Sequence, residues 1–400
     1  MNYLADRIEK LSESETLAMT RISRELTLKG FNVINLSIGQ PDFNTPENIK
    51  DAAKEALDEN YTTYSPVSGY LDLRQAISKK FKRDNNLEYS PDQIIVSTGA
   101  KQSIANAMLS LVNPGEEVIV PTPYWVSYRE IIKLAEGKPV YIEALIDNDF
   151  KVTPDQIEKN ITEKTKVFIF SSPCNPTGSV YTKEELRGIA EVFSRYKNIF
   201  IISDEIYEHI NFNGKHESIA QFDNIYDRVI TVNGVSKAFA MTGWRLGYMG
   251  ASKEIVNACD KLQGQITSGA SSISQRAALK AVSIDPTKSE ELKTMVIAFR
   301  ERRDLSLKLL NEIPGIKTNV PLGAFYIFPN ITDYFGKSNG DLTINDSSDL
   351  CFYLLNKVYV ALVPGDAFGD PNCIRFSYAT SKEKLIEAIS RIKKALSELS

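Results

Sequence analysis

Short runs of consecutive apolar residues alternate with amphipathic segments through the middle of the chain. Seven of these runs predict buried strands, at residues 93–97, 117–120, 138–142, 166–170, 198–203, 228–232 and 246–249. Runs that are apolar at nearly every position are typical of strands covered on both faces. Helical patterns separate them, such as 183–196, where Thr182 and Glu185 form a capping box. We therefore predict an α/β fold, with a mostly parallel seven-stranded sheet covered by helices.

The pattern changes at both ends of this region. Residue Thr45 is expected to cap a first helix whose first turn contains Pro46. After Pro286 we expect one long helix at 288–313, then strands at 323–328, 359–363 and 373–378, and a final helix from Lys382. The predicted organisation is a segment 1–45 that joins the small domain, a large domain at 46–290, and a smaller α+β domain at 291–400.

Composition narrows the class of protein. The 400 residues are 42% hydrophobic and carry a net charge of −4, so no strong positive field favours nucleic acid or an anionic membrane. No apolar run is long enough for a membrane span, and the N-terminus lacks the apolar stretch of a secretory signal. Two histidines and four cysteines, with no Cys-x-x-Cys pair, argue against a disulfide scaffold or metal site. We expect a cytoplasmic enzyme whose chemistry does not depend on histidine.

The most informative motif runs from Ser236-Lys237 to Arg245, just before a predicted strand. A lysine is nucleophilic only when it is neutral, and burial or nearby cations lower its pKa. Such a lysine suits a Schiff base with an aldehyde cofactor, and Ser236 and Arg245 are placed to hold a phosphate. A bare Ser-Lys pair is more often a solvated surface loop.

Three further motifs follow predicted strands. Asp204 lies at the end of one strand, where its carboxylate can hold a pyridine nitrogen protonated; the alternative is that it caps a helix. Tyr207 can donate a hydrogen bond to a phenolate oxygen. The prolines around Asn175 stiffen its turn. Small residues at Gly99-Ala100 open a helix whose free N–H groups point at an anion.

Taken in order, these motifs identify the chain as resembling the fold-type I pyridoxal-phosphate aminotransferases, closest to the aspartate aminotransferases of bacteria, some of which also use prephenate. The resemblance runs from about residue 4 to the C-terminus. It rests on the following residues: Gly39-Gln40-Pro41-Asp42-Phe43, Tyr64, Gly99-Ala100-Lys101, Tyr124-Trp125, Asn175-Pro176-Thr177-Gly178, Asp204-Glu205-Ile206-Tyr207, Ser236-Lys237, Arg245 and Arg375. Each motif alone is weak, but their common order and spacing are specific.

The resemblance implies roles. Lys237 would bind pyridoxal 5′-phosphate covalently and carry the proton, Asp204 would pair with the ring nitrogen, and Tyr207 would bond the ring oxygen. The remaining implied cofactor contacts are Asn175 at the ring oxygen, Trp125 on the ring face, and Gly99, Ala100, Lys101, Ser236 and Arg245 at the phosphate. Tyr64 would reach the phosphate of the neighbouring subunit, which implies a homodimer.

The resemblance also implies a substrate site. Arg375 would clamp the α-carboxylate, with Gly39, Asn175 and Trp125 near it, and Lys101 would reach the distal carboxylate of aspartate. The expected reaction moves the amino group of L-aspartate to 2-oxoglutarate with ping-pong kinetics. Residues 14–16 could line the same pocket, and an inward Glu15 would disfavour dicarboxylates. Prephenate, aromatic amino acids, alanine and β-elimination remain alternatives.

Other interpretations are weaker. A dehydrogenase would need a Gly-x-Gly-x-x-Gly turn, a regulator would need an additional DNA-binding module, and an inactive binding protein would be expected to lack Lys237. We expect His209 and His216 to be structural or surface residues, and Cys174 to be a neutral buried thiol. The cluster Arg300–Arg303 is expected to be a solvated helix face.

Overall fold

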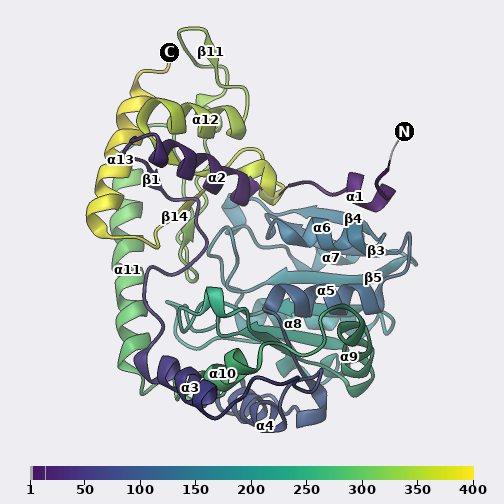
Figure 1. The fold of residues 1–400 in the computed structure, drawn as a ribbon. Helices are drawn as coiled ribbons and strands as arrows, with labels where there is room; N and C mark the ends of the chain where they lie inside the picture. Colours follow the sequence, from purple (N-terminus) through teal and green to yellow (C-terminus); the bar gives the residue numbers. More distant parts are fainter. Residues whose placement is uncertain (1–2, 14) are drawn as a thin grey trace.

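A seven-stranded sheet forms the centre of the molecule (Figure 1). The computed structural model describes residues 3–13 and 15–400. The strands are β2 (Ile94–Ser97), β3 (Glu117–Thr122), β4 (Lys138–Glu143), β5 (Thr165–Ser171), β6 (Phe200–Asp204), β7 (Val229–Gly234) and β8 (Gly247–Gly250), in the order β2-β8-β7-β6-β5-β3-β4. Only β8 is antiparallel to its neighbours. The predicted α/β fold with a mostly parallel sheet is confirmed.

The sheet is buried on both faces because its side chains alternate between two cores. Ile95, Val167 and Ile169 belong to one core, whereas Ile94 and Phe168 belong to the other. The first core contains residues of α5 (Ala100–Leu111), α6 (Ser127–Leu134) and α9 (Lys253–Ile266). The second contains residues of α3 (Glu47–Asp58), α4 (Leu71–Lys80), α8 (Lys183–Ser194) and α10 (Ser272–Ser283). The short helix α7 (Pro154–Lys159) packs against α8. Two apolar layers explain why the strand segments are almost continuously hydrophobic.

Two capping predictions have opposite outcomes. Thr182 accepts a hydrogen bond from the N–H of Glu185, and the Glu185 carboxylate accepts one from the N–H of Thr182, which confirms the capping box. The prediction for Thr45 is wrong, because Pro46 occupies the N-cap position of α3. The Thr45 hydroxyl instead donates to the carbonyl of Ala240 and accepts from the indole of Trp244. A tertiary contact has taken the place of the local cap.

A smaller group of elements lies beside the sheet, around the long helix α11 (Glu290–Leu310). It contains α2 (Glu15–Leu28), β1 (Ile34–Asn35), β9 (Tyr326–Ile327), β10 (Ser338–Asn339), β11 (Leu342–Thr343), α12 (Ser347–Val358), β12 (Val360–Ala361), β13 (Val363–Pro364), β14 (Ile374–Ser377) and α13 (Lys382–Ser397). Helix α1 (Asp6–Glu9) lies apart from this group, beside α6, where Lys133 donates a hydrogen bond to the carbonyl of Lys10. The run predicted as one strand at 359–363 forms two, because β12 pairs with β1 and β13 with β14. Strand β1, from the N-terminal segment, pairs in parallel with β12, from the C-terminal part of the chain. The domain boundaries at residues 45 and 290 remain predictions.

The prediction of a solvated face for Arg300–Arg303 holds for Arg300 and Glu301, which are exposed, but is wrong for Arg302 and Arg303. Arg302 forms an ion pair of 2.6 Å with Asp42, and its side chain is 12% exposed. Arg303 is equally buried and donates to the carbonyl of Pro321, while Arg300 donates to the carbonyl of Phe212. These arginines attach α11 to loops that border the sheet. Helical spacing alone did not reveal these partners, because they lie far away in sequence.

None of the helices within the described residues combines the length and apolar character that crossing a membrane requires.

Candidate active site

The predicted site residues converge at one edge of the sheet. Gly99 follows β2, Trp125 follows β3 and Asn175 follows β5; Asp204 ends β6, and Lys237 follows β7. Because these five strands run in the same direction, their carboxyl ends meet there. Ligands of open α/β sheets bind at this edge.

A cavity of about 390 Å³ occupies that position. Its lining includes these residues predicted from the sequence: Gly39, Ala100, Lys101, Trp125, Asn175, Asp204, Tyr207, Ser236, Lys237, Arg245 and Arg375. Gly99 is not part of the lining, but it is the N-cap residue of α5 and directly precedes Ala100, which is. Tyr64 does not line it, and its side chain is 98% exposed. The structure therefore brings together every predicted site residue of one chain except the tyrosine expected to serve a neighbouring subunit.

Lys237 lies in the loop after β7, with its ammonium group directed into the cavity. Its Nζ donates a hydrogen bond of 2.6 Å to the carbonyl of Gly39 and lies 5.5 Å from the ring centre of Tyr207. Burial lowers the pKa of Lys237 to about 7, and Arg375 and Arg245 act in the same direction, whereas Asp204 opposes them. A large fraction of this amine is therefore neutral near pH 7, the state in which it is nucleophilic.

Asp204 is the acid of the cavity, and its partner was missed in the sequence. The carboxylate is 5% exposed and accepts a hydrogen bond of 2.7 Å from the hydroxyl of Tyr128, on α6. Burial raises the pKa of Asp204 to about 6, while Tyr128, the N–H of Ile206 and Lys237 act to lower it. Tyr128 resembles any other apolar-face residue of a helix in the sequence, so no local signal distinguished it.

Arg375, in β14, is buried and lines the same cavity. Its Nη1 donates to Oδ1 of Asn175 at 3.0 Å and its Nη2 donates to the carbonyl of Ser37 at 2.6 Å. The Nε has no hydrogen-bond partner among the described residues. The guanidinium stacks between the rings of Tyr326 and Phe368, 4.6 and 4.9 Å from their centres. This buried cation is held in position by neutral groups, an arrangement that suits an incoming carboxylate.

Tyr326 also connects two of the predicted residues. Its hydroxyl forms a hydrogen bond of 2.9 Å with that of Tyr207. A side chain at Gly39 would place its Cβ 2.9 Å from the same hydroxyl, so a glycine is needed there. Tyr326 belongs to β9, in the C-terminal part of the chain. It lies 119 positions from Tyr207, so no local sequence pattern indicates that their hydroxyl groups meet.

The N-terminus of α5 forms the base of the cavity. Gly99 has a φ of +84° and no side-chain cap, and a Cβ there would lie 2.3 Å from Nη2 of Arg245. Arg245 comes close because residue 99 lacks a side chain, and Ser236 lines the same region. Free N–H groups, a hydroxyl and a guanidinium together form a suitable cradle for a phosphate.

The open side of the cavity contains Lys101. Its Nζ lies 5.1 Å from the ring centre of Trp125, and burial together with Arg245 lowers its pKa. Thr16 and Leu17 line the same region. Ser14 and the side chain of Glu15, for which a role was predicted, lie outside the described residues.

Charge in this cavity is unbalanced. Among the described residues, the lining contains four cationic side chains, Lys101, Lys237, Arg245 and Arg375, and one carboxylate, that of Asp204. Within the described chain, none of the four cations forms an ion pair with a carboxylate. The cavity is therefore built for ligands with several negative charges.

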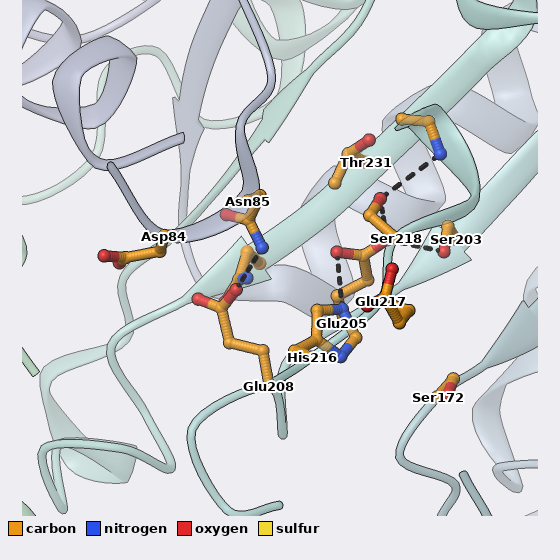
Figure 2. A network of polar contacts seen from close by, with 12 residues as sticks. Asp84, Asn85, Ser172, Ser203, Glu205, Glu208, His216, Glu217, Ser218 and Thr231 are labelled. Carbon is orange, nitrogen blue, oxygen red and sulfur yellow. Dashed lines mark hydrogen bonds and ion pairs between the residues drawn. The ribbon is translucent and has the colours of Figure 1, made fainter. Parts of the chain in front are cut away.

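The residues expected to be structural lie outside the cavity lining. His216 is buried and its Nε2 lies 2.9 Å from Glu205 (Figure 2); burial opposes its protonation, but the carboxylate prevails and raises the pKa. His209 lies 3.1 Å from Glu208. Cys174 is buried, and burial raises the pKa of its thiol, in agreement with a neutral side chain.

Comparison with known proteins identifies the family of the chain. The family model for aminotransferase class I and II matches residues 32–392. The chain is 50% identical to a bifunctional aspartate aminotransferase and glutamate/aspartate-prephenate aminotransferase of Petunia hybrida, over 98% of this chain and 82% of that protein. It is 46% identical to an aspartate/prephenate aminotransferase of Cereibacter sphaeroides, over 98% of both chains.

Solved structures show the same relationship. An aspartate aminotransferase of Thermus thermophilus, solved with maleate, matches with a TM-score of 0.93 and 37% identity over 99% of this chain and 100% of that one. One from Rhizobium meliloti matches with a TM-score of 0.95 and 41% identity over 100% of both chains. The chain belongs to the class I and II aminotransferase family, and it is an aminotransferase.

Proposed function

We propose that this protein uses pyridoxal 5′-phosphate to move the amino group of L-aspartate to 2-oxoglutarate, forming oxaloacetate and L-glutamate. One observation supports this most strongly: Lys237, with a pKa of about 7, shares a cavity with Arg375, a buried cation that has no carboxylate partner in the described chain. The first provides a neutral amine and the second a site for an α-carboxylate.

The residues present fit the cofactor. The cradle formed by Gly99, Ser236 and Arg245 suits its phosphate, and a Cβ at position 99 would occupy the space that Arg245 fills. Asp204 suits its ring nitrogen, because a buried carboxylate favours a protonated pyridine. Asn175 and Tyr207 suit the ring oxygen, and Trp125 the ring face. When bound, the cofactor supplies an aldehyde that carries the amino group and a ring that accepts electrons.

The chain's own groups perform the remaining steps. Lys237 would hold the cofactor covalently between turnovers, and its amine, once freed, would take up the Cα proton of the amino acid and act as the proton carrier. Asp204, held by Tyr128, would keep the ring nitrogen of the bound cofactor protonated. Arg375 holds the α-carboxylate through its nitrogen atoms and thereby orients the Cα–H bond for proton transfer.

Lys101 supports the choice of a dicarboxylic substrate. Its ammonium group stands at the open side of the cavity without an anionic partner in the described chain, so it can bind a second carboxylate. Maleate, the ligand in the Thermus structure, is a four-carbon dicarboxylate. Prephenate also has two carboxylates, and the names of the relatives from Petunia and Cereibacter make it the second candidate substrate.

A homodimer and a cytoplasmic location complete the proposal. Tyr64 is 98% exposed and lies outside the cavity of its own chain, as expected for a residue that completes the site of a partner.

The experiment is reconstitution of the purified protein with pyridoxal 5′-phosphate. We expect oxaloacetate and glutamate in equal amounts, parallel double-reciprocal plots, and labelling of Lys237 when borohydride reduction is followed by peptide mapping. Lys237→Ala serves as the control and should lose both labelling and activity. With a cysteine conjugate as the substrate, release of its thiol together with pyruvate and ammonia, instead of amino-group transfer, would favour β-elimination. Labelling of another lysine would contradict the assigned site.

A further inference from the structure

The turn that follows β6 has two chemically different sides. Asp204 and Tyr207 line the cavity. Glu205 and Glu208 instead belong to a buried polar network, which we call the anchor cluster (Figure 2). The anchor cluster consists of Lys80, Asn85, Ser203, Glu205, Glu208, His216 and Ser218, all of which are buried. The two site residues and the two anchored glutamates thus alternate along five consecutive positions.

Glu205 is held by three contacts. The hydroxyls of Ser203 and Ser218 donate to its Oε1 at 2.9 and 2.6 Å, and Nε2 of His216 lies 2.9 Å from its Oε2. Its side chain is 1% exposed. A buried carboxylate with these partners has very little freedom to move, and it directly follows Asp204.

Glu208 connects the same turn to the C-terminal end of helix α4. Its carboxylate forms an ion pair with Lys80, at the end of α4, and accepts a hydrogen bond of 2.8 Å from Asn85. The ammonium of Lys80 in turn donates to Oδ1 of Asn85 at 2.8 Å. Both charged side chains are 2% exposed, so the pair is almost completely removed from water.

Stability alone does not explain such a cluster. Apolar residues of similar volume would commonly stabilise a core as well as a buried ion pair does, whereas a polar network also fixes one geometry. Donor atoms of Glu205, Glu208 and His216 lie within 4.8 Å of one another, a spacing that a metal ion would suit. Because Lys80 already supplies a positive charge to Glu208, the cluster does not need a metal for compensation.

We propose that the anchor cluster is a positioning device for the active site: Glu205 and Glu208 fix the turn after β6 so that Asp204 and Tyr207 face the cavity. They are positioning residues, since neither of them belongs to the cavity lining. The inference rests on the proposed function, because it assigns Asp204 and Tyr207 to the cofactor.

The main variants are Glu205→Gln and Glu208→Gln, which keep the side-chain shape and remove the charge, and Ser218→Ala is a milder one should these fail to fold. Arg228→Gln is the matched control. Arg228 is also buried and bonded, to the carbonyls of Tyr196 and Ile199, but it lies at the amino end of β7, at the opposite edge of the sheet.

Two readouts separate positioning from general stability. In the cofactor-free protein, we expect hydrogen exchange of amides 204–210 to accelerate about tenfold in the glutamate variants, as a local loosening of the turn predicts. In the loaded enzyme, kcat should fall by about 10- to 100-fold while KM for the amino acid stays within about threefold, because a misplaced group affects the reaction more than substrate binding. When Arg228→Gln is compared with a glutamate variant that has the same loss in Tm, it should change neither the exchange rate of amides 204–210 nor kcat.

Faster exchange without a fall in kcat would overturn the inference, as would unchanged exchange or equal effects in the Arg228 control. If the unaltered protein neither binds pyridoxal 5′-phosphate nor transfers an amino group, the proposed function fails. The exchange measurement then still shows whether the anchor cluster holds the turn, so the two failures can be distinguished.

Discussion

The hydroxyl of Tyr128 donates a hydrogen bond of 2.7 Å to the carboxylate of Asp204, although 76 positions separate the two residues. The bond joins α6 to the end of β6 beneath the cavity. It stabilises the ionised form of an acid whose burial otherwise favours the neutral form. Asp204 therefore depends on a residue that no sequence motif indicated.

Tyr128→Phe should raise the pKa of Asp204 further above its present value of about 6, because the variant loses a donor to the carboxylate. A carboxyl-carbon NMR titration of the cofactor-free protein measures this directly. In the loaded enzyme, kcat should fall, since less of the anion is available for the ring nitrogen. Tyr353→Phe is the control, because Tyr353 is also buried and donates a single hydrogen bond, to Ala395. An unchanged Asp204 titration in Tyr128→Phe would show that burial alone sets its pKa.

Lys237→Met should stabilise the cofactor-free protein in a pH-dependent way. The pKa of Lys237 falls from 10.5 to about 7 on folding, so the unfolded chain binds the proton more tightly. The native protein therefore loses stability as the pH falls from above 10.5 through about 7, and a neutral methionine removes that loss. Tm of the variant should exceed that of the unaltered protein at pH 6, and the gain should shrink toward pH 10.

The control for this experiment is Lys138→Met, at an exposed lysine on the surface of β4, which should leave the pH dependence of Tm unchanged. A gain for Lys237→Met that is equal at pH 6 and pH 10 would indicate better packing rather than removal of a buried charge.

Lys101→Ala should reduce activity toward aspartate and oxaloacetate far more than toward alanine or phenylalanine. A charge-assisted hydrogen bond contributes roughly 1.5–3 kcal/mol, which corresponds to a loss of about 10- to 150-fold in kcat/KM. Arg375 can serve only the α-carboxylate, so a second carboxylate needs its own cation. The kcat/KM values for the four substrates, measured on both proteins, test this. Equal losses for aspartate and alanine would mean that Lys101 serves the cofactor instead.

Mixing two impaired variants should raise the activity if Tyr64 completes a partner's site. A dimer of one Tyr64→Ala chain and one Lys237→Ala chain has one site with both residues intact. We expect each pure variant to be impaired and the refolded mixture to exceed the mean of the two. Cofactor affinity of the mixture provides a second measurement. No gain in a mixture shown to contain mixed dimers would contradict the shared site.

The sequence alone determined the fold class and most of the residues that line the cavity. Buried parallel strands are apolar at consecutive positions, and Asn175, Asp204 and Lys237 each lie at or just after the carboxyl end of such a strand. Local pattern therefore placed these three residues at one edge of the sheet. The capping box at Thr182 was also predicted correctly, because both partners lie within one helical turn.

Only the tertiary structure decided the partners of those residues. Tyr128 at Asp204, Tyr326 at Tyr207 and the arginines of α11 are separated from their contacts by long stretches of chain. The same applies to Thr45, whose hydroxyl binds a loop 195 residues away instead of capping its own helix. Periodicity reports which face of an element is buried, but burial alone does not specify which distant group meets it. The chemistry of the site follows from the sequence, whereas its pKa values and geometry follow from the packing.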